Sequence, residues 1–222
     1  MRVEWHGQAA FTLRGAEGTV VIDPFGDVSS LQARGIRWEY PPVQVPPADL
    51  VLVTHEHLDH NAVEVVPGEP AVIRSSAGRH ESPLGEVVGI ASEHDRAAGT
   101  ERGANVIYVF SLDGIRVAHF GDFGQTELRP EQRQAIGEVD LVFLPAGGGP
   151  TIDGEAAAGI ARELAAAWAV PMHYRTPRIG FLEDEGSFAA HILDHVRIDA
   201  SSFDTVELPR RDRPVGVIPQ AP

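Results

Sequence analysis

Short apolar runs separated by turn residues recur along most of this 222-residue chain. Runs of four to eight Val, Ile, Leu and Phe residues, bounded by Gly, Pro, Asp or Asn, are typical of β-strands. They predict strands at residues 3–5, 11–13, 19–22, 50–53, 71–74, 87–91, 105–112, 115–120, 141–144, 170–173 and 205–208. An Asp-Gly pair at positions 113 and 114 predicts a hairpin between two of these strands.

Helical patterns are few and come late in the chain. An Ala-rich helix is expected at about residues 154–168, with Asp153 as its N-cap, and a second near residues 187–195. Residues 25–47 contain four Pro, together with Trp38 and Tyr40, and are predicted to form a long loop of the kind that acts as a lid. The Pro- and Arg-rich residues 209–222 are predicted to be a loose tail. Many strands, few helices and no linker predict one α/β domain over residues 1–222.

Composition removes several classes of function. The net charge of 18 − 32 = −14 disfavours nucleic-acid and membrane partners, because the chain repels phosphates at long range. The chain has no Lys and no Cys, which excludes Schiff-base catalysis, phosphate-binding P-loops, thiol nucleophiles and Cys-ligated zinc. No apolar run approaches the roughly 18 residues of a membrane span, and the first residues resemble a strand rather than a signal peptide. We therefore expect a cytoplasmic location.

The chemistry is concentrated in one hexapeptide, His55-Glu56-His57-Leu58-Asp59-His60, which follows a wholly apolar strand. In an extended segment His55 and His57 point the same way, and a turn at Leu58 would bring Asp59 and His60 to the same space. Three imidazoles and one carboxylate at this spacing are satisfied together by a divalent metal ion. A helical zinc-protease motif does not fit, because it needs two His four residues apart on a helix.

Residues 54–60 match the Thr-His-x-His-x-Asp-His motif of the metallo-β-lactamase superfamily. His94, Asp122 after Gly121, and His173 follow in the order in which that superfamily places its later ligands. The resemblance implies a four-layer αββα metallo-β-lactamase-type sandwich with two divalent metal ions, zinc being the first choice and manganese or iron the alternatives. It assigns His55, His57 and His94 to the first ion, Asp59, His60 and His173 to the second, and Asp122 to a bridging position. It also makes Asp59 a catalytic residue that accepts a hydrogen bond from the nucleophilic hydroxide.

Residues 121–124, 147–151 and 172–174 further resemble a branch of small stand-alone members that includes phosphorylated-ascorbate lactonases. This resemblance implies a binuclear hydrolase that uses a metal-bound hydroxide on a small-molecule ester, lactone or phosphoester. A nuclease of the same superfamily and a non-catalytic metal-binding protein are the alternatives. We expect a small-molecule substrate and neither a nucleic acid nor a membrane as partner, with the oligomeric state left open.

Five further residues have two readings each. His119 is either a core histidine or a partner that supports the metal ligands, and His6 is either a strand residue or a member of the site. Asp23 either orients a ligand histidine or only forms the turn before Pro24. Tyr174 and Arg175 would contact substrate if His173 is a ligand, and Arg175 is otherwise an exposed arginine without a role in the site.

Overall fold

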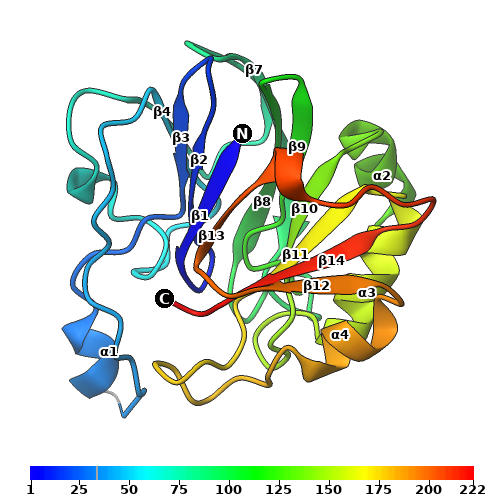
Figure 1. Ribbon diagram of the computed structural model, residues 1–222. Helices are drawn as coiled ribbons and strands as arrows, with labels where there is room; N and C mark the ends of the chain where they lie inside the picture. The colour runs from blue at the N-terminus through cyan, green and yellow to red at the C-terminus, as the bar shows by residue number, and fades with distance from the viewer. Residues whose placement is uncertain (34) are drawn as a thin grey trace.

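The apolar runs of the sequence pair into two mixed β-sheets that pack face to face (Figure 1). The computed structural model describes residues 1–33 and 35–222. Within these residues one sheet has six strands, in the order β13-β1-β2-β3-β4-β5. The other sheet has eight strands, in the order β12-β14-β11-β10-β9-β8-β7-β6.

The elements have the following bounds. The six-stranded sheet consists of β1 (Arg2–Gly7), β2 (Ala10–Arg14), β3 (Thr19–Ile22), β4 (Leu50–Val53), β5 (Ala71–Arg74) and β13 (Ser202–Asp204). The eight-stranded sheet consists of β6 (Gly78–Ser82), β7 (Gly85–Glu93), β8 (Ala104–Leu112), β9 (Ile115–His119), β10 (Leu141–Pro145), β11 (Trp168–Met172), β12 (His195–Ile198) and β14 (Val215–Pro219). The helices are α1 (Ser29–Ala33), α2 (Pro130–Ile136), α3 (Gly154–Glu163) and α4 (Gly186–His191), with 3₁₀ turns η1 (Val63–Val65) and η2 (Thr205–Glu207).

The core between the sheets is built from side chains that alternate along each strand. In β3, Val20 and Ile22 face this core, whereas Val21 faces outward. Phe11 of the first sheet meets Phe143 of the second with ring centroids 4.5 Å apart, and both rings are fully buried. Each such burial contributes about 1.5–3 kcal/mol. These contacts hold the edges of the two sheets, where the candidate site lies, in a defined relative position.

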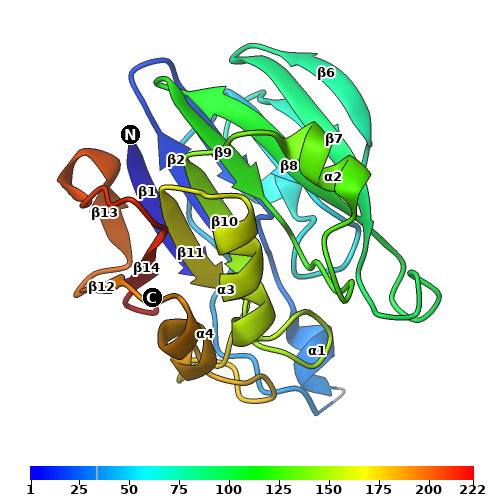
Figure 2. The same cartoon turned by 90° about the vertical axis from the view of Figure 1, so that its right-hand side faces the viewer.

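The outer layers differ between the two sheets. Helices α2, α3 and α4 lie over the outer face of the eight-stranded sheet (Figure 2). The first turn of α3 is capped by Asp153, whose carboxylate accepts a hydrogen bond from the Ala156 backbone N–H at 2.9 Å. The six-stranded sheet is covered mainly by residues 25–47, where the rings of Phe25 and Trp38 pack edge to face. The four-layer α/β fold class is thus confirmed, with a packed loop supplying most of one outer layer.

The prediction of a loose tail at residues 209–222 is wrong. This segment contains β14, which pairs in parallel with β11 on one side and β12 on the other, and all five of its residues are buried. Pro214 precedes the strand and Pro219 is its last residue, so neither proline removes a hydrogen bond from the middle of the strand. Pairing with two neighbouring strands therefore orders a segment whose composition indicates a flexible tail.

Other differences follow from local chemistry. Residues 205–207 form the 3₁₀ turn η2 rather than a strand, and the strand β13 comes just before it. The two expected helices end earlier, at Glu163 and His191, because β11 and β12 begin at Trp168 and His195. The sequence did not predict β6, a polar Gly-Arg-His-Glu-Ser strand at the edge of its sheet, nor the short helix α2.

The topology brings the carboxyl ends of several strands to one edge. β3 runs parallel to β4, and β9, β10 and β11 run parallel to one another. β7 has the same direction as β9, because each is antiparallel to β8 between them. The residues that follow these strands, including all seven predicted ligands, are therefore delivered to the same end of the sandwich.

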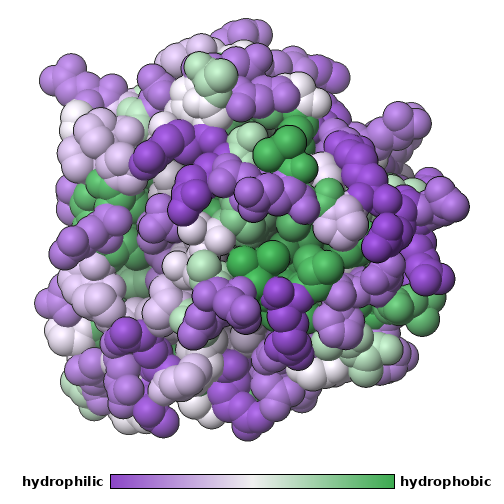
Figure 3. Space-filling model, in the orientation of Figure 1, coloured by the Kyte–Doolittle hydropathy of each residue, from purple (hydrophilic) through white to green (hydrophobic). Residues whose placement is uncertain are grey.

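Hydrophilic residues cover most of the face seen in Figure 3, and hydrophobic ones gather near its centre, over the region between β13 and β14.

Among residues 1–33 and 35–222, no helix is long and apolar enough to cross a membrane.

Candidate metal centre

The seven side chains predicted as ligands lie together at the carboxyl-end edge of the two sheets. They form three overlapping groups, and within each group the possible ligand atoms lie within 4.8 Å of one another. The groups are His55–His57–His94, His55–His60–Asp122 and Asp59–His60–His173. Two of these groups have the same members as the two predicted sets of three, and Asp122 belongs to the group that overlaps both.

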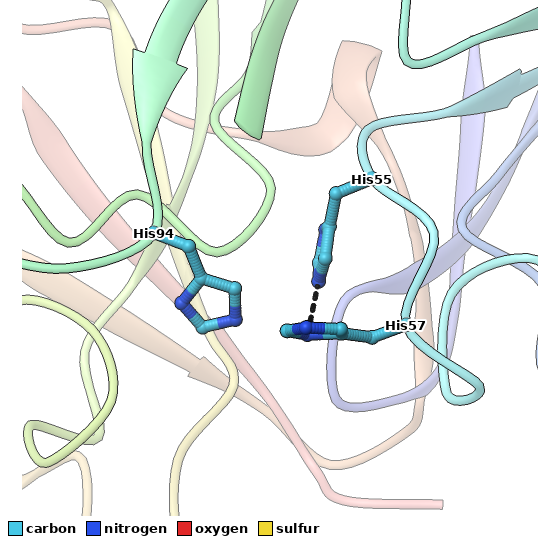
Figure 4. A group of neighbouring side chains, drawn as sticks. All are labelled: His55, His57 and His94. Carbon is cyan, nitrogen blue, oxygen red and sulfur yellow. Dashed lines mark hydrogen bonds between the residues drawn. The ribbon is translucent and has the colours of Figure 1, made fainter. Parts of the chain in front are cut away.

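The first group joins residues from both sheets. His55 and His57 follow β4, whereas His94 follows β7 (Figure 4). The rings point toward one another, with His55 Nε2 3.0 Å from His57 Nδ1. His57 is the member most accessible to solvent, while His55 and His94 are buried.

Asp122 occupies the centre of the whole cluster. Its Oδ2 lies 3.0 Å from His94 Nε2, 3.3 Å from His173 Nε2 and 3.4 Å from His60 Nε2. The same oxygen is 3.9 Å from His55 Nε2. One carboxylate oxygen therefore faces imidazoles of both sets, which is the position a bridging ligand would need.

Asp23 anchors the loop that carries the first histidines. Its Oδ1 accepts a hydrogen bond from the Thr54 backbone N–H at 2.8 Å, and its Oδ2 accepts one from the Thr54 hydroxyl at 2.7 Å. The same Oδ2 lies 3.0 Å from His60 Nδ1. Asp23 is fully buried and has a positive φ of 47°. The reading in which Asp23 orients a histidine is therefore the one that this geometry supports.

These contacts define which ring nitrogens carry protons. The carboxylate of Asp23 can only accept, so His60 donates from Nδ1. The Thr54 hydroxyl donates its one hydrogen to Asp23, so it accepts from Nδ1 of His55, at 3.1 Å. His94 Nδ1 likewise donates to the Pro150 carbonyl at 3.2 Å. When these three rings are neutral, each has its Nε2 lone pair free, and those of His94 and His60 lie 3.0 and 3.4 Å from Asp122 Oδ2.

This arrangement tests whether the residues fit a metal ion. Lone pairs of several imidazoles and of a carboxylate oxygen face one another here. They repel each other unless a proton or a metal cation between them supplies positive charge. Among the described residues, His60 Nε2 and Asp122 Oδ1 are buried and have no hydrogen-bond partner. Buried polar atoms without a partner are costly, and coordination would satisfy them. The donor set, with His and carboxylate ligands, therefore fits a divalent cation.

The pKa shifts in the cluster arise from burial and from the close approach of its imidazoles and carboxylates. Burial alone would lower the pKa of His60, but the carboxylates of Asp122, Asp59 and Asp23 outweigh it and hold that pKa well above its usual range. Burial would raise the pKa of Asp122, yet the surrounding imidazoles hold it well below its usual range. Burial lowers the pKa of His55 well below its usual value, and the charge of His60 lowers it further. The cluster thus stabilises positive charge on His60 and negative charge on Asp122, but not positive charge on His55.

The backbone before Asp122 is shaped by its neighbours. Gly121 has a φ of +56°, and a Cβ there would lie 2.4 Å from Asn105 Oδ1 and 2.6 Å from Thr54 Oγ1. Asn105 accepts a hydrogen bond from the Asp122 backbone N–H at 3.1 Å. His119 accepts one from the Gly121 N–H at Nδ1 and lies 3.0 Å from the Ala9 carbonyl through Nε2. His119 is therefore a satisfied core histidine that also supports the turn leading to Asp122.

Comparison with known proteins identifies the family. The family model described as "Beta-lactamase superfamily domain" matches residues 2–173. The chain belongs to this superfamily. A UPF0173 metal-dependent hydrolase of Thermococcus onnurineus is 31% identical over 202 residues, covering 79% of this chain and 85% of the relative. One of Bacillus subtilis is 28% identical over 239 residues, covering 94% of this chain and 100% of the relative.

A solved structure from Thermotoga maritima has the same fold. It is described as a candidate zinc-dependent hydrolase of the metallo-β-lactamase superfamily, is 29% identical, and superposes with a TM-score of 0.77 over 99% of both chains. The chain is thus a member of the UPF0173 metal-dependent hydrolases within this superfamily. The resemblance to the superfamily that the HxHxDH motif indicates is confirmed.

A cavity of about 530 Å³ opens beside the cluster of predicted ligands. Five of the seven predicted ligands line it: His57, Asp59, His94, Asp122 and His173. Asp59 is half-buried at its wall, with Oδ2 3.8 Å from His60 Nε2. Glu56 points elsewhere, since its carboxylate pairs with Arg74 at 2.6 Å and accepts from Ser75.

The remaining candidates lie outside the cavity. His6 bonds Thr12 on the neighbouring strand at 2.8 Å. Tyr174 is buried in the core against Trp5, with ring centroids 5.2 Å apart. Arg175 pairs with Asp184 at 2.6 Å on the surface. For all three the structural reading replaces the functional one.

Sequence reasoning missed other parts of the site. From the loop predicted to act as a lid, Trp38 lines the cavity, whereas Tyr40 is buried and its hydroxyl lies 2.6 Å from that of Thr176. Arg102 and Phe181, which also line the cavity, carry no sequence motif. Only the folding of their loops toward the cluster identifies them.

Proposed function

We propose that the chain is a binuclear metal-dependent hydrolase of small molecules. His55, His57 and His94 would hold one divalent cation, Asp59, His60 and His173 the other, and Asp122 would lie between them. The observation that carries this proposal is the convergence of imidazole lone pairs on Asp122 Oδ2, at 3.0–3.4 Å for three of them. Zinc is the preferred ion, since His and carboxylate ligands suit it, with manganese or iron as alternatives.

When bound, the cations would supply a nucleophile at neutral pH by lowering the pKa of a coordinated water from about 15.7 to about 7. The chain's own residues would do the rest. Asp59, at the cavity wall, would accept a proton from the attacking water and return it to the leaving group. Asp23 and Thr54 would hold His60 and His55 in the tautomers that leave Nε2 free. Water would be consumed and the ester split into an acid and an alcohol.

The size of the cavity supports a small-molecule substrate. A volume of about 530 Å³ lies within the range of small-molecule pockets, roughly 300–1,000 Å³. An ester, lactone or phosphoester of a small molecule fits it, and the resemblance to phosphorylated-ascorbate lactonases favours this class. The nuclease alternative would need a basic groove, yet in the described part of the chain Arg102 is the one cationic side chain other than histidine that lines the cavity.

The test combines metal analysis with an activity screen. Purified protein should contain up to two divalent ions per chain and should hydrolyse a member of a panel of esters, lactones and phosphoesters, with activity lost on chelation. A metal-free protein that cannot be loaded would refute the proposal. A fully loaded protein with no activity on any class would instead favour the non-catalytic alternative.

A further inference from the structure

The cavity beside the cluster has an apolar wall that the metal ligands do not explain. Trp38, Leu58, Phe181 and Pro150 line it, together with Leu31 and Ile36. Leu58 and Phe181 remain 42% and 54% exposed, although large apolar side chains are usually buried. Exposed apolar side chains around a polar floor are typical of a pocket that covers the organic part of a ligand.

One cation lies in this otherwise apolar wall. Arg102 lines the cavity and is exposed. Many arginines of this acidic chain are paired, for example Arg175 with Asp184 and Arg74 with Glu56, but within residues 1–33 and 35–222 no carboxylate pairs with Arg102. Its guanidinium is therefore available to a ligand. A guanidinium presents a planar fork that binds carboxylate or phosphate through two hydrogen bonds.

The loop that carries Arg102 is held in place by a single carboxylate. Asp95 accepts hydrogen bonds from the backbone N–H groups of Ala97 and Gly99 through Oδ1, at 2.8 and 2.9 Å. Through Oδ2 it accepts from Glu101 at 3.1 Å and from Arg102 at 2.8 Å.

The same loop begins at a predicted metal ligand. His94 donates its backbone N–H to the Gly103 carbonyl at 3.1 Å, so the two ends of the loop are joined. The backbone of Arg102 is thereby tied to that of His94. This connection fixes the backbone position of Arg102 beside the cluster.

We propose that the cavity selects small substrates that carry an oxyanion, a carboxylate or a phosphate, on an apolar or aromatic body. Arg102 binds the oxyanion, Phe181 and Leu58 cover the apolar body, and the bond to be hydrolysed is presented to the metal cluster. This inference rests on the proposed hydrolase function for the last step only, since binding itself needs only the cavity wall.

The test measures binding of three probes of similar shape by calorimetry: benzoate, phenyl phosphate and neutral benzamide. Metal-loaded and chelator-treated protein are both measured, because an oxyanion can also bind a metal ion directly. We expect the wild type to bind at least one anion more tightly than benzamide. Arg102→Gln should weaken anion binding roughly ten-fold or more and leave benzamide unchanged. Phe181→Ala should weaken all three probes alike. Comparison of benzoate with phenyl phosphate shows which oxyanion is preferred.

Matched controls come from the same chain. Arg96→Gln removes a cation from the same loop that does not line the cavity, and Val206→Ala trims an 87% exposed apolar side chain elsewhere. Both should bind like the wild type. If Arg102→Gln binds the anions as tightly as Arg96→Gln, or if the wild type does not discriminate anion from benzamide, the inference is wrong. Metal content measured on each sample separates this failure from a failure of the metal centre.

Discussion

Replacing Asp23 by Asn tests whether the outer contacts of the cluster control its chemistry. Asp23 receives three donors on two oxygens: the Thr54 N–H, the Thr54 hydroxyl and His60 Nδ1. Asn keeps one acceptor oxygen but presents an NH₂ group where the second oxygen was. With the amide oxygen at the Thr54 N–H, that NH₂ meets the Thr54 hydroxyl and His60 Nδ1, both of which donate in the wild type.

The cheapest adjustment moves the proton of His60 from Nδ1 to Nε2. Nδ1 can then accept from the Asn side chain, but Nε2 loses the lone pair that faces Asp122 at 3.4 Å. Changes to groups that orient a ligand histidine typically cost 10–100-fold in metal affinity. That corresponds to about 1.4–2.8 kcal/mol. Without metal, loss of a charge-assisted hydrogen bond should lower the free energy of unfolding by about 1.5–3 kcal/mol.

Two measurements check this expectation. Metal affinity is measured by competition with a chelator of known affinity, and stability by urea unfolding of chelator-treated protein. Asp113→Asn is the matched control. Asp113 lies in the turn before β9, at the opposite end of the sandwich, and accepts hydrogen bonds from the backbone N–H groups of Ala16 and Glu17. If Asp23→Asn binds metal within about threefold of the wild type while Asp113→Asn does the same, the tautomer argument is refuted.

Three further outcomes are expected. Asp59→Asn should lower turnover by a factor of roughly 10²–10⁴ while at least one cation per chain is retained. Glu56→Gln should be close to wild type, because the Glu56 carboxylate pairs with Arg74 outside the cluster. Equal losses in both variants would mean that the wrong face of this loop has been assigned to the ligands. Chelation should lower the melting temperature and metal should restore it by mass action, which calorimetry with and without metal can check. Asp153→Ala should lower the free energy of unfolding by about 0.5–2 kcal/mol with unchanged metal content, and an unchanged urea midpoint would argue against the cap.

The sequence predicts four ligands within residues 55–60 because metal ligation demands particular side chains at particular spacings. The pattern of residues 55–60 requires an extended segment and then a turn, and the structure places it after β4. His94, Asp122 and His173 carry no such local pattern. Their assignment came from the resemblance in motif order, and the structure brings them within a few ångströms of the first group.

Apart from Trp38, the cavity wall could not be predicted, because its residues become neighbours only after folding. Arg102 is an ordinary surface residue in sequence until Asp95 closes its loop against His94. The same reason explains why the sequence does not predict the strands β14 and β6. The β14 region is rich in proline, and β6 consists of polar residues and glycine. In both cases pairing with adjacent strands, a property of the whole sheet, outweighs local composition.

The division of the ligands between the sheets has a physical consequence of its own. His55, His57 and His60 follow a strand of the six-stranded sheet, whereas His94, Asp122 and His173 follow strands of the eight-stranded one. A cation bound by both sets would tie the sheets together at the edge where the core between them ends. The free energy of metal binding would therefore become part of the free energy that holds the sandwich closed. The geometry of the proposed centre would in turn depend on the packing of Phe11 against Phe143, because any sliding of one sheet on the other would separate the two halves of the ligand set.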